Sequence, residues 1–368
     1  MNLTISQSRL RELDFLRGVA IILVLFRHQH FFELGRTMGW IGVDLFFVLS
    51  GFLVSGLLFK EYKRNGFIDP LRFLIRRGFK IYPVYYSFFI IYLLYYYFFL
   101  GTKLSALYLI SDLAFLQNYM SGWGYLYDAS WSLAVEEHFY FGLTLVVWLA
   151  IKKGLQLNVS DQENRISLIE KSIFFAMVTC LVLRIISNYI SPDQLARNFS
   201  MTHLRIDSLL AGVYIAYLFY FKGEYLREFY TKYKKVLLVI PFVVLLFTPF
   251  LDPVYSFFVK TFGFTLIYLS FGCILIIFVS AGTINKKLNS VLGRHLVDII
   301  SKIGFYSYSI YVIHSLIFEI VKSWKITNDA LVFILSIAIS IFAGKIVSDV
   351  FEAYFLRLRE RYYPSKVS

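Results

Sequence analysis

The feature that constrains this fold most is the recurrence of long apolar stretches along the chain. Apolar runs of about 18 residues or more indicate helices that cross a membrane. A composition of 58% hydrophobic and only 17% charged residues excludes an ordinary soluble domain. The sequence therefore predicts an all-α integral membrane protein with about ten transmembrane helices. The stretches lie at residues 14–32, 40–59, 81–100, 132–151, 172–190, 204–221, 236–251, 261–281, 303–322 and 330–352.

The distribution of lysine and arginine predicts the orientation of these helices. If the N-terminus is cytoplasmic, the segments 1–13, 60–80, 152–171, 222–235, 282–302 and 353–368 face the cytoplasm and carry 26 Lys and Arg, against 5 in the opposite loops. Cytoplasmic loops of membrane proteins are enriched in these residues. The net charge of +13 then needs no nucleic-acid partner. We expect a multi-pass protein of the inner (cytoplasmic) membrane, surrounded by lipids, with both termini in the cytoplasm.

The chain shows no repeat, low-complexity run or hydrophilic insertion that would mark a second unit. We expect one membrane domain over residues 1–368, with spans from about 14 to 352, a short cytoplasmic tail at 353–368 and no appended soluble domain. Cys180 and Cys273 both fall in apolar stretches, which suggests neither a disulfide framework nor a metal site. The aromatic outer loop 101–131 is predicted to pack as a lid or a partly re-entrant segment.

The first apolar stretch carries two ionisable residues, Arg17 and His28. They are eleven residues apart, which on a helix places them within roughly 20° of one face and about 16 Å apart along the axis. An ionisable group at membrane depth is costly and normally faces a wet interior or a partner. This helix is therefore predicted to present a cation near the cytoplasmic surface, and a titratable base deeper in, to an interior polar cavity.

Two acidic residues are expected at a depth similar to that of His28. Asp44 lies about four residues into the second stretch from its outer end, and Glu136 lies similarly in the fourth. Histidine titrates near neutral pH in water, so His28 is the natural general base. Either carboxylate could orient its ring and stabilise the imidazolium. We predict His28, Asp44 and Glu136 as the catalytic group.

Other charges at this depth allow two interpretations. Arg184, Arg205 and Asp207 lie in the outer parts of the fifth and sixth stretches, where they are either structural pairs or part of a functional cavity. His314 lies near the middle of the ninth stretch, where a hydrogen-bonded contact between helices is the ordinary role of a lone histidine.

Three cations open the third stretch. Arg76, Arg77 and Lys80 share a helix face by their spacing. Cations at the N-terminal end of a helix meet its positive dipole end, which makes more sense if a polyanion docks there. The alternative is positive-inside charge that meets anionic lipid headgroups.

Together these segments resemble acyltransferase family 3 of membrane-bound O-acyltransferases. The family's signature is an arginine, ten residues and a histidine, as in Arg17 to His28. The segment 76–83 resembles its basic motif, with Lys80 where arginine is usual, which keeps the charge but loses bidentate phosphate geometry. The resemblance runs in order from residue 10 to about 320. The remaining similar segments are 42–52, 131–136, 308–314 and Arg205-Ile206-Asp207 with Gly212.

The resemblance implies an acyl-coenzyme A donor, by default acetyl-coenzyme A, used as a co-substrate with no permanently bound cofactor. It implies a carbohydrate hydroxyl acceptor, usually an extracytoplasmic polysaccharide or lipid-linked sugar of the bacterial envelope. Whether a covalent acyl-enzyme forms stays open, as does the oligomeric state. The residues expected to bind the donor are Arg17, Arg76, Arg77 and Lys80, and those expected to contact substrate are Trp131, Ser132, Glu137, Arg205, Asp207 and His314.

A transporter or flippase of a polar lipid-linked glycan is the alternative function, because the same charges could line a path. The internal symmetry common in such folds is not evident in this sequence.

Overall fold

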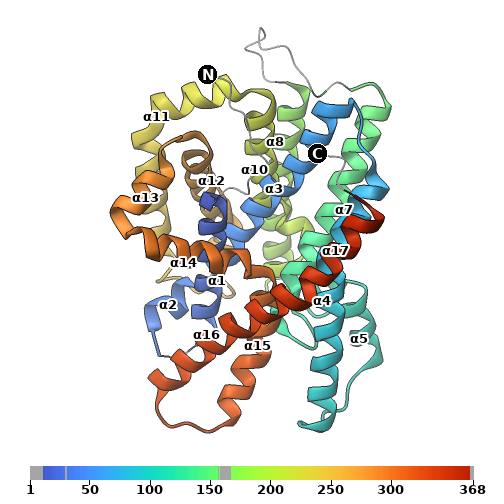
Figure 1. Ribbon diagram of the computed structural model, residues 1–368, viewed down its shortest axis with the longest axis vertical. Coiled ribbons are helices and arrows are strands. Elements are labelled where there is room, and N and C mark those ends of the chain that lie inside the picture. Colours follow the sequence, from blue (N-terminus) through green and yellow to red (C-terminus); the bar gives the residue numbers. More distant parts are fainter. Residues whose placement is uncertain (1–10, 30, 156, 158–166, 365–368) are drawn as a thin grey trace.

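The computed structural model describes residues 11–29, 31–155, 157 and 167–364, and every regular element within these ranges is a helix (Figure 1). Parts of the predicted cytoplasmic segments 1–13, 152–171 and 353–368 lie outside the described residues. The all-helical prediction is confirmed for the described part. In its first half the elements are α1 (Arg11–Arg27), α2 (Glu33–Met38), α3 (Ile41–Asn65), α4 (Pro70–Phe98), α5 (Ala106–Leu113), α6 (Gln117–Met120), the 3-10 turn η1 (Asp128–Ser130) and α7 (Trp131–Lys152).

In the second half of the chain η2 and η3 are 3-10 turns, whereas the backbone forms π-helical turns at η4 and η5. The elements are α8 (Leu168–Ile190), α9 (Leu195–Ser200), η2 (Thr202–Leu204), α10 (Ile206–Phe221), α11 (Gly223–Val244), η3 (Leu245–Phe247), η4 (Val259–Gly263), α12 (Phe264–Ser280), α13 (Ile284–Leu292), α14 (Arg294–Phe305), α15 (Ser307–Ser323), α16 (Asp329–Ile346), η5 (Val347–Glu352) and α17 (Ala353–Tyr362).

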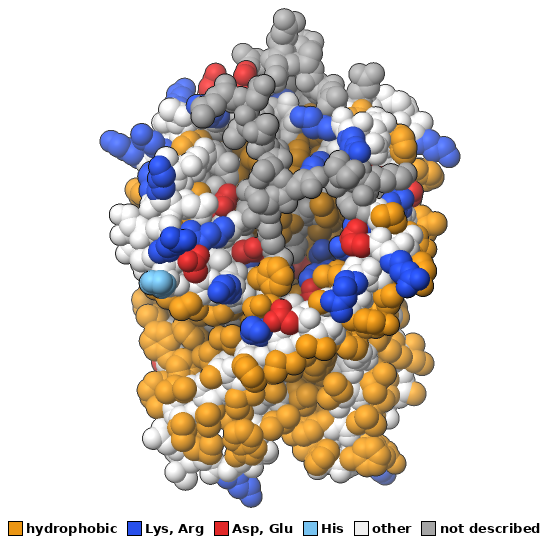
Figure 2. Space-filling view, viewed as in Figure 1, with side chains coloured by type: hydrophobic (Ala, Val, Ile, Leu, Met, Phe, Trp, Pro, Cys, Tyr) orange, Lys and Arg blue, Asp and Glu red, His pale blue; other side chains and the backbone are white. Residues whose placement is uncertain are grey.

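Six helical segments among the described residues are long and apolar enough to cross a membrane. The count becomes seven if α14 and α15, bent by 78° at their junction, form one span. Two of the predicted spans are shorter than expected, because α1 has 17 residues and α10 has 16. The chain is therefore a multi-pass membrane protein by helix length and composition. Figure 2 shows one face of the molecule. Charged side chains gather mostly over its upper half, and hydrophobic side chains cover most of its lower half, as expected for a protein embedded in a membrane.

Glycines allow the closest helix contacts. A Cβ atom added to Gly51 in α3 would lie 1.9 Å from the carbonyl oxygen of Leu209 in α10. One added to Gly304 in α14 would lie 1.8 Å from that of Asp14 in α1. Small residues at membrane helix interfaces let backbones approach in this way. These two contacts fix α3 against α10 and α1 against α14, which positions the ends of α1 and α10 that carry the site residues.

The loop over residues 101–131, predicted to lie on the outer side, packs against the helices. The Asp112 carboxylate in α5 accepts hydrogen bonds from the backbone N–H groups of Tyr125 and Leu126, at 3.0–3.1 Å. Phe115 stacks on Tyr85 of α4 with ring centroids 4.5 Å apart. The loop is thereby held against α4, and it delivers η1 to the wall of the site described below.

Candidate active site

His28 lies just beyond the end of α1. The helix ends at Arg27, several residues before the end of the predicted 14–32 stretch, and His28 is the first residue of the turn that follows. Its side chain is exposed and lines two cavities of about 370 and 220 Å³, which we call the outer cavities after the orientation predicted from the sequence. Asp128 of η1 lines both of these cavities as well. The histidine therefore stands at the junction of two open spaces, where a second molecule can reach its ring.

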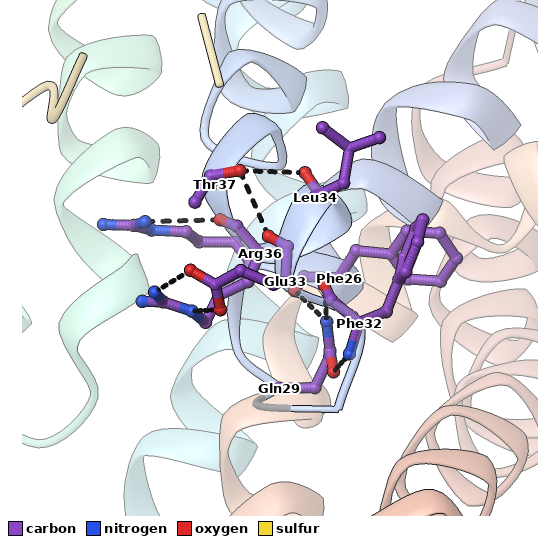
Figure 3. Close-up of polar contacts among 8 residues, drawn as sticks. Phe26, Gln29, Phe32, Glu33, Leu34, Arg36 and Thr37 are labelled. Atoms are coloured by element: carbon purple, nitrogen blue, oxygen red, sulfur yellow. Dashed lines mark hydrogen bonds and ion pairs between the residues drawn. The ribbon is translucent and has the colours of Figure 1, made fainter. Parts of the chain in front are cut away.

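The turn that presents His28 is held by the side chain of Gln29. Its amide nitrogen donates to the carbonyl oxygens of Phe26 at 3.1 Å and Phe32 at 2.8 Å, and its oxygen accepts from the Phe32 N–H at 2.8 Å (Figure 3). Gln29 is only 4% exposed. A buried amide that joins both sides of the turn fixes the backbone that carries His28.

The ring neighbour of His28 is His314 of α15. Their centroids lie 4.9 Å apart with an interplanar angle of 60°. The Nδ1 atom of His314 lies 2.6 Å from the Tyr311 carbonyl oxygen, which can only accept, so Nδ1 carries a proton. Its Nε2 lies 3.4 Å from the Ser315 hydroxyl. Both hydrogen bonds of His314 lie within α15, and its contact with the α1 end is the ring contact with His28.

The expected carboxylate partners of His28 lie elsewhere. Asp44 accepts from Arg205 at 2.8 Å and from the Ser208 hydroxyl at 3.3 Å. Within the described ranges no carboxylate lies within hydrogen-bonding or ion-pair distance of the His28 ring. Asp44 lies in the protein interior, as its predicted depth requires. Its position along the chain did not show that Arg205 forms an ion pair with it.

A second ion pair lies beside the first. Arg184 of α8 contacts Asp207 of α10 at 2.7 Å and donates to the Thr265 hydroxyl at 2.6 Å. Asp44, Arg184, Arg205 and Asp207 all have fully buried side chains. We call these four residues the buried ion-pair network. Trp131 belongs to its packing, because the Arg205 guanidinium lies 5.6 Å from the Trp131 ring centroid. For Arg184, Arg205 and Asp207 the geometry thus agrees with the structural alternative.

Most of the predicted donor residues line a third cavity. This space of about 110 Å³ lies between α1, α3, α4, α7 and α15, and we call it the basic cavity. Its polar and charged lining residues are Arg17, Ser50, Arg77, Lys80, Ser132, Glu136, Glu137, Ser307, Tyr308 and Tyr311.

Glu136 belongs to the basic cavity and not to the His28 cavities. Its Oε1 accepts from the Ser50 hydroxyl at 2.9 Å, and its Oε2 accepts from Tyr140. Arg77 donates to the Tyr140 hydroxyl at 2.7 Å, and its guanidinium lies 4.4 Å from the Tyr140 ring centroid. Glu136 therefore helps to fix Arg77 through Tyr140, whereas the predicted contact with His28 is absent from the described structure.

The three cations that were predicted to share one helix face have different surroundings in the structure. Arg77 and Lys80 line the basic cavity, and Lys80 is also paired with Glu352 of η5. Arg76 lies outside the cavity lining and contacts Glu360 of α17 at 2.8 Å. Sequence spacing alone could not show that α17 crosses back over the start of α4 and takes one of the three charges.

Tyr311 lies between the basic cavity and the smaller of the two outer cavities. Tyr311 and Val43 line both the basic cavity and the 220 Å³ outer cavity. The Tyr311 hydroxyl lies 2.6 Å from the Ser132 hydroxyl and donates to the Ala129 carbonyl oxygen at 2.8 Å. Arg17 and His28 thus line two spaces that have Tyr311 and Val43 in common.

Sequence reasoning missed Gln29, Asp128, Glu319 and Tyr311. Tyr311 lies inside the segment 308–314 and Gln29 follows His28 directly, so both were adjacent to a recognised signal. Asp128 and Glu319 line the 370 Å³ cavity with His28, but nothing in their spacing marks them.

Comparison with known proteins identifies the family. The sequence matches the family described as "Acyltransferase domain" over residues 10–350. O-acetyltransferase OatA of Staphylococcus aureus (strain NCTC 8325 / PS 47) is 27% identical over 220 residues, covering 56% of this chain and 34% of that protein. The S. aureus (strain COL) protein named "Putative O-acetyltransferase SACOL0978" is 28% identical over 352 residues, covering 89% of this chain and 54% of its own length.

The chain thus spans about a third to a half of the length of these relatives. No solved structure matches it. The family match covers nearly all of the sequence in which the arginine–histidine signature and its companion segments were found, so the protein belongs to acyltransferase family 3 and is an acyltransferase.

Proposed function

We propose that this protein transfers an acetyl group from acetyl-coenzyme A, bound from the cytoplasmic side, to a hydroxyl of an envelope or lipid-linked carbohydrate. The observation that carries the proposal is the pair of separate spaces on either side of Tyr311, one lined by cations and one by His28. In this proposal ten helical stretches cross the cytoplasmic membrane and both termini are cytoplasmic. The basic cavity then opens toward the cytoplasm and the His28 cavities toward the outside.

The donor is held by charge. Arg17, Arg77 and Lys80 line one small space, and cations in such a site bind phosphate oxygens through charge-assisted hydrogen bonds. Arg77 is pre-oriented by Tyr140, which reduces the rotamer freedom lost on binding. Lys80 contributes a point charge without the planar geometry of arginine. Arg76 is assigned to the contact with Glu360 and not to the donor.

His28 acts as the general base. Its imidazole takes the proton of the acceptor hydroxyl as the oxygen attacks the thioester carbonyl carbon. The carbon–sulfur bond breaks, and the imidazolium returns the proton to the leaving thiolate, so that the products are the ester and free coenzyme A. His314 donates its Nδ1 proton to the Tyr311 carbonyl oxygen and packs against the His28 ring, which restrains the orientation of that ring. Direct transfer needs no acyl-enzyme.

The acceptor enters through the outer cavities. The larger one combines aromatic and hydrogen-bonding side chains, among them Tyr96, Asp128, Phe318 and Glu319. Glu319 accepts from the Tyr96 hydroxyl at 3.1 Å. Carbohydrates offer hydroxyl groups to carboxylates and C–H faces to aromatic rings. A sugar seated there has His28 at the inner end of its site.

The test is acyl transfer from radiolabelled acetyl-coenzyme A to envelope glycan in membranes that contain the protein. We expect transfer by the wild type and at least a hundredfold loss in His28→Ala and Arg17→Ala. His295→Ala is the matched control, because His295 is exposed on α14 and lines none of the three cavities. Full transfer by normally inserted His28→Ala would contradict the proposal. Loss of glycan export without acylation would favour the flippase, since spaces in series also suit transport.

A further inference from the structure

Three buried polar atoms in the basic cavity have no hydrogen-bond partner among the described residues. They are Oε1 of Glu137, Oγ of Ser307 and Nε of Arg77. Glu137 is 4% exposed and Ser307 is 1% exposed. Buried polar groups in native proteins are nearly always paired, and an unpaired one costs about as much as a lost hydrogen bond. Three such atoms around one space indicate that something polar fills it.

The neighbouring glutamate shows that unpaired atoms are not general in this cavity. Both oxygens of Glu136 accept hydrogen bonds, from Ser50 and Tyr140. Glu137 uses only Oε2, which accepts from the Tyr82 hydroxyl at 2.9 Å. That contact fixes the carboxyl group and leaves Oε1 as a positioned acceptor.

The three atoms match the hydrogen-bonding groups of an amide. Oε1 of Glu137 accepts, Nε of Arg77 donates, and a serine hydroxyl does either. A secondary amide offers one N–H donor and one carbonyl acceptor. Apolar side chains complete the lining, including Phe46, Leu53 and Val54. A volume of about 110 Å³ is below the usual range for whole ligands and suits a narrow chain better than a nucleotide.

We propose that Glu137, Ser307 and the Nε atom of Arg77 form a subsite for an amide-bearing arm of the thioester donor, in the same cavity as the cations that hold its phosphates. This inference rests on the proposed function. It assigns the unpaired atoms to the pantetheine part of coenzyme A, whose two amides lie between the phosphates and the sulfur. The subsite orients the arm so that the thioester points toward the Tyr311 wall and His28.

The test compares binding of the arm with binding of the nucleotide. Purified full-length protein is titrated with coenzyme A, with pantetheine, which has the amides but no phosphate, and with 3′-phosphoadenosine 5′-phosphate, which has phosphates but no arm. Displacement of labelled coenzyme A gives each Kd. Glu137→Gln should weaken coenzyme A and pantetheine about tenfold, and Ser307→Ala about threefold, with the nucleotide unchanged. Arg17→Ala should weaken coenzyme A and the nucleotide but not pantetheine.

Two variants serve as controls. Ser280→Ala removes a hydroxyl that is also buried and unpaired but lines none of the three cavities, and Glu228→Gln changes an exposed glutamate on α11. Both should bind all three probes as the wild type does. Equal effects of Glu137→Gln on pantetheine and nucleotide, or no effect on either, would overturn the subsite. Wild-type protein that binds neither coenzyme A nor nucleotide would instead contradict the proposed function itself.

Discussion

The buried ion-pair network and the basic cavity use the same kinds of residue in opposite ways. In the network, Arg205 and Asp44 are fully buried and form an ion pair at 2.8 Å, although Oδ2 of Asp44 and both Nε and Nη1 of Arg205 have no hydrogen-bond partner among the described residues. Arg77 and Glu137 also have unpaired atoms, but these two residues line the basic cavity, whereas the network residues line none of the three cavities. Charge that is paired across two helices and lines no cavity joins those helices, whereas charge that lines a cavity can contact a ligand. The difference separates structural from functional residues more sharply than membrane depth does.

Breaking the network should have the largest effect on stability. Arg205→Met leaves Asp44 buried without its cation, and removal of one partner of a buried pair costs about 3–5 kcal/mol. We expect a strongly lowered midpoint in thermal unfolding of the detergent-purified protein. The double variant Asp44→Leu/Arg205→Met removes both charges and should recover much of that stability. A single variant as stable as the wild type would mean that the pair is not what joins α3 to α10.

The α3–α10 contact that carries this ion pair should be the next most sensitive feature. Gly51→Ala places a methyl group against the Leu209 backbone, and overpacking of this kind typically costs about 1–3 kcal/mol. Gly142→Ala is the matched control, because its added Cβ meets nothing within 4 Å and alanine favours helix by about 0.5–1 kcal/mol. Thermal unfolding should therefore move in opposite directions for the two variants. Equal midpoints would show that α10 shifts to accommodate the methyl group.

Much of the fold could be predicted from the sequence because apolar length and charge bias are local signals. The helical stretches needed only hydropathy, and Arg17 and His28 needed only helix periodicity to be selected. Helix ends were less predictable. The predicted first stretch runs to Phe32, but α1 ends at Arg27, because the Gln29 side chain closes a turn there.

The partners of the charges could not be predicted, because they depend on which helices pack together. Asp44, Glu136 and His28 share a predicted depth, yet Asp44 pairs with Arg205 and Glu136 faces another cavity. Residues at the same depth in the membrane can lie on different helices or helix faces, so a shared depth does not imply a contact. Arg76 shows the same limit, since its partner Glu360 lies 284 residues away along the chain.

Removing the support of the His28 turn should lower activity more than stability. Gln29→Ala deletes three hydrogen bonds that hold the turn together. Misplacement of a catalytic group by about 1 Å can cost about a hundredfold in rate, so we expect a ten- to hundredfold lower kcat with an unchanged Kd for coenzyme A. Gln194→Ala is the control, because this exposed side chain at the start of α9 makes no hydrogen bond within the described part of the chain. Loss of coenzyme A binding in Gln29→Ala would indicate that the turn supports the basic cavity as well.

Weakening the wall between the two spaces should have the smallest effect on stability and a specific effect on chemistry. Tyr311→Phe keeps the ring against Phe46 but removes the hydroxyl contacts with Ser132 and Ala129, at a cost of about 0.5–1.5 kcal/mol. Because that hydroxyl fastens the ring across the path from the basic cavity to His28, its loss should admit water to the thioester more often. Hydrolysis of acetyl-coenzyme A without acceptor should then rise a few-fold. Tyr354→Phe, on the exposed face of α17, should leave hydrolysis unchanged. If hydrolysis in Tyr311→Phe also stays unchanged, the ring alone separates the two spaces. Hydrolysis must then rise in Tyr311→Ala, which lacks the ring. No rise in either variant would contradict a junction of the two spaces at Tyr311.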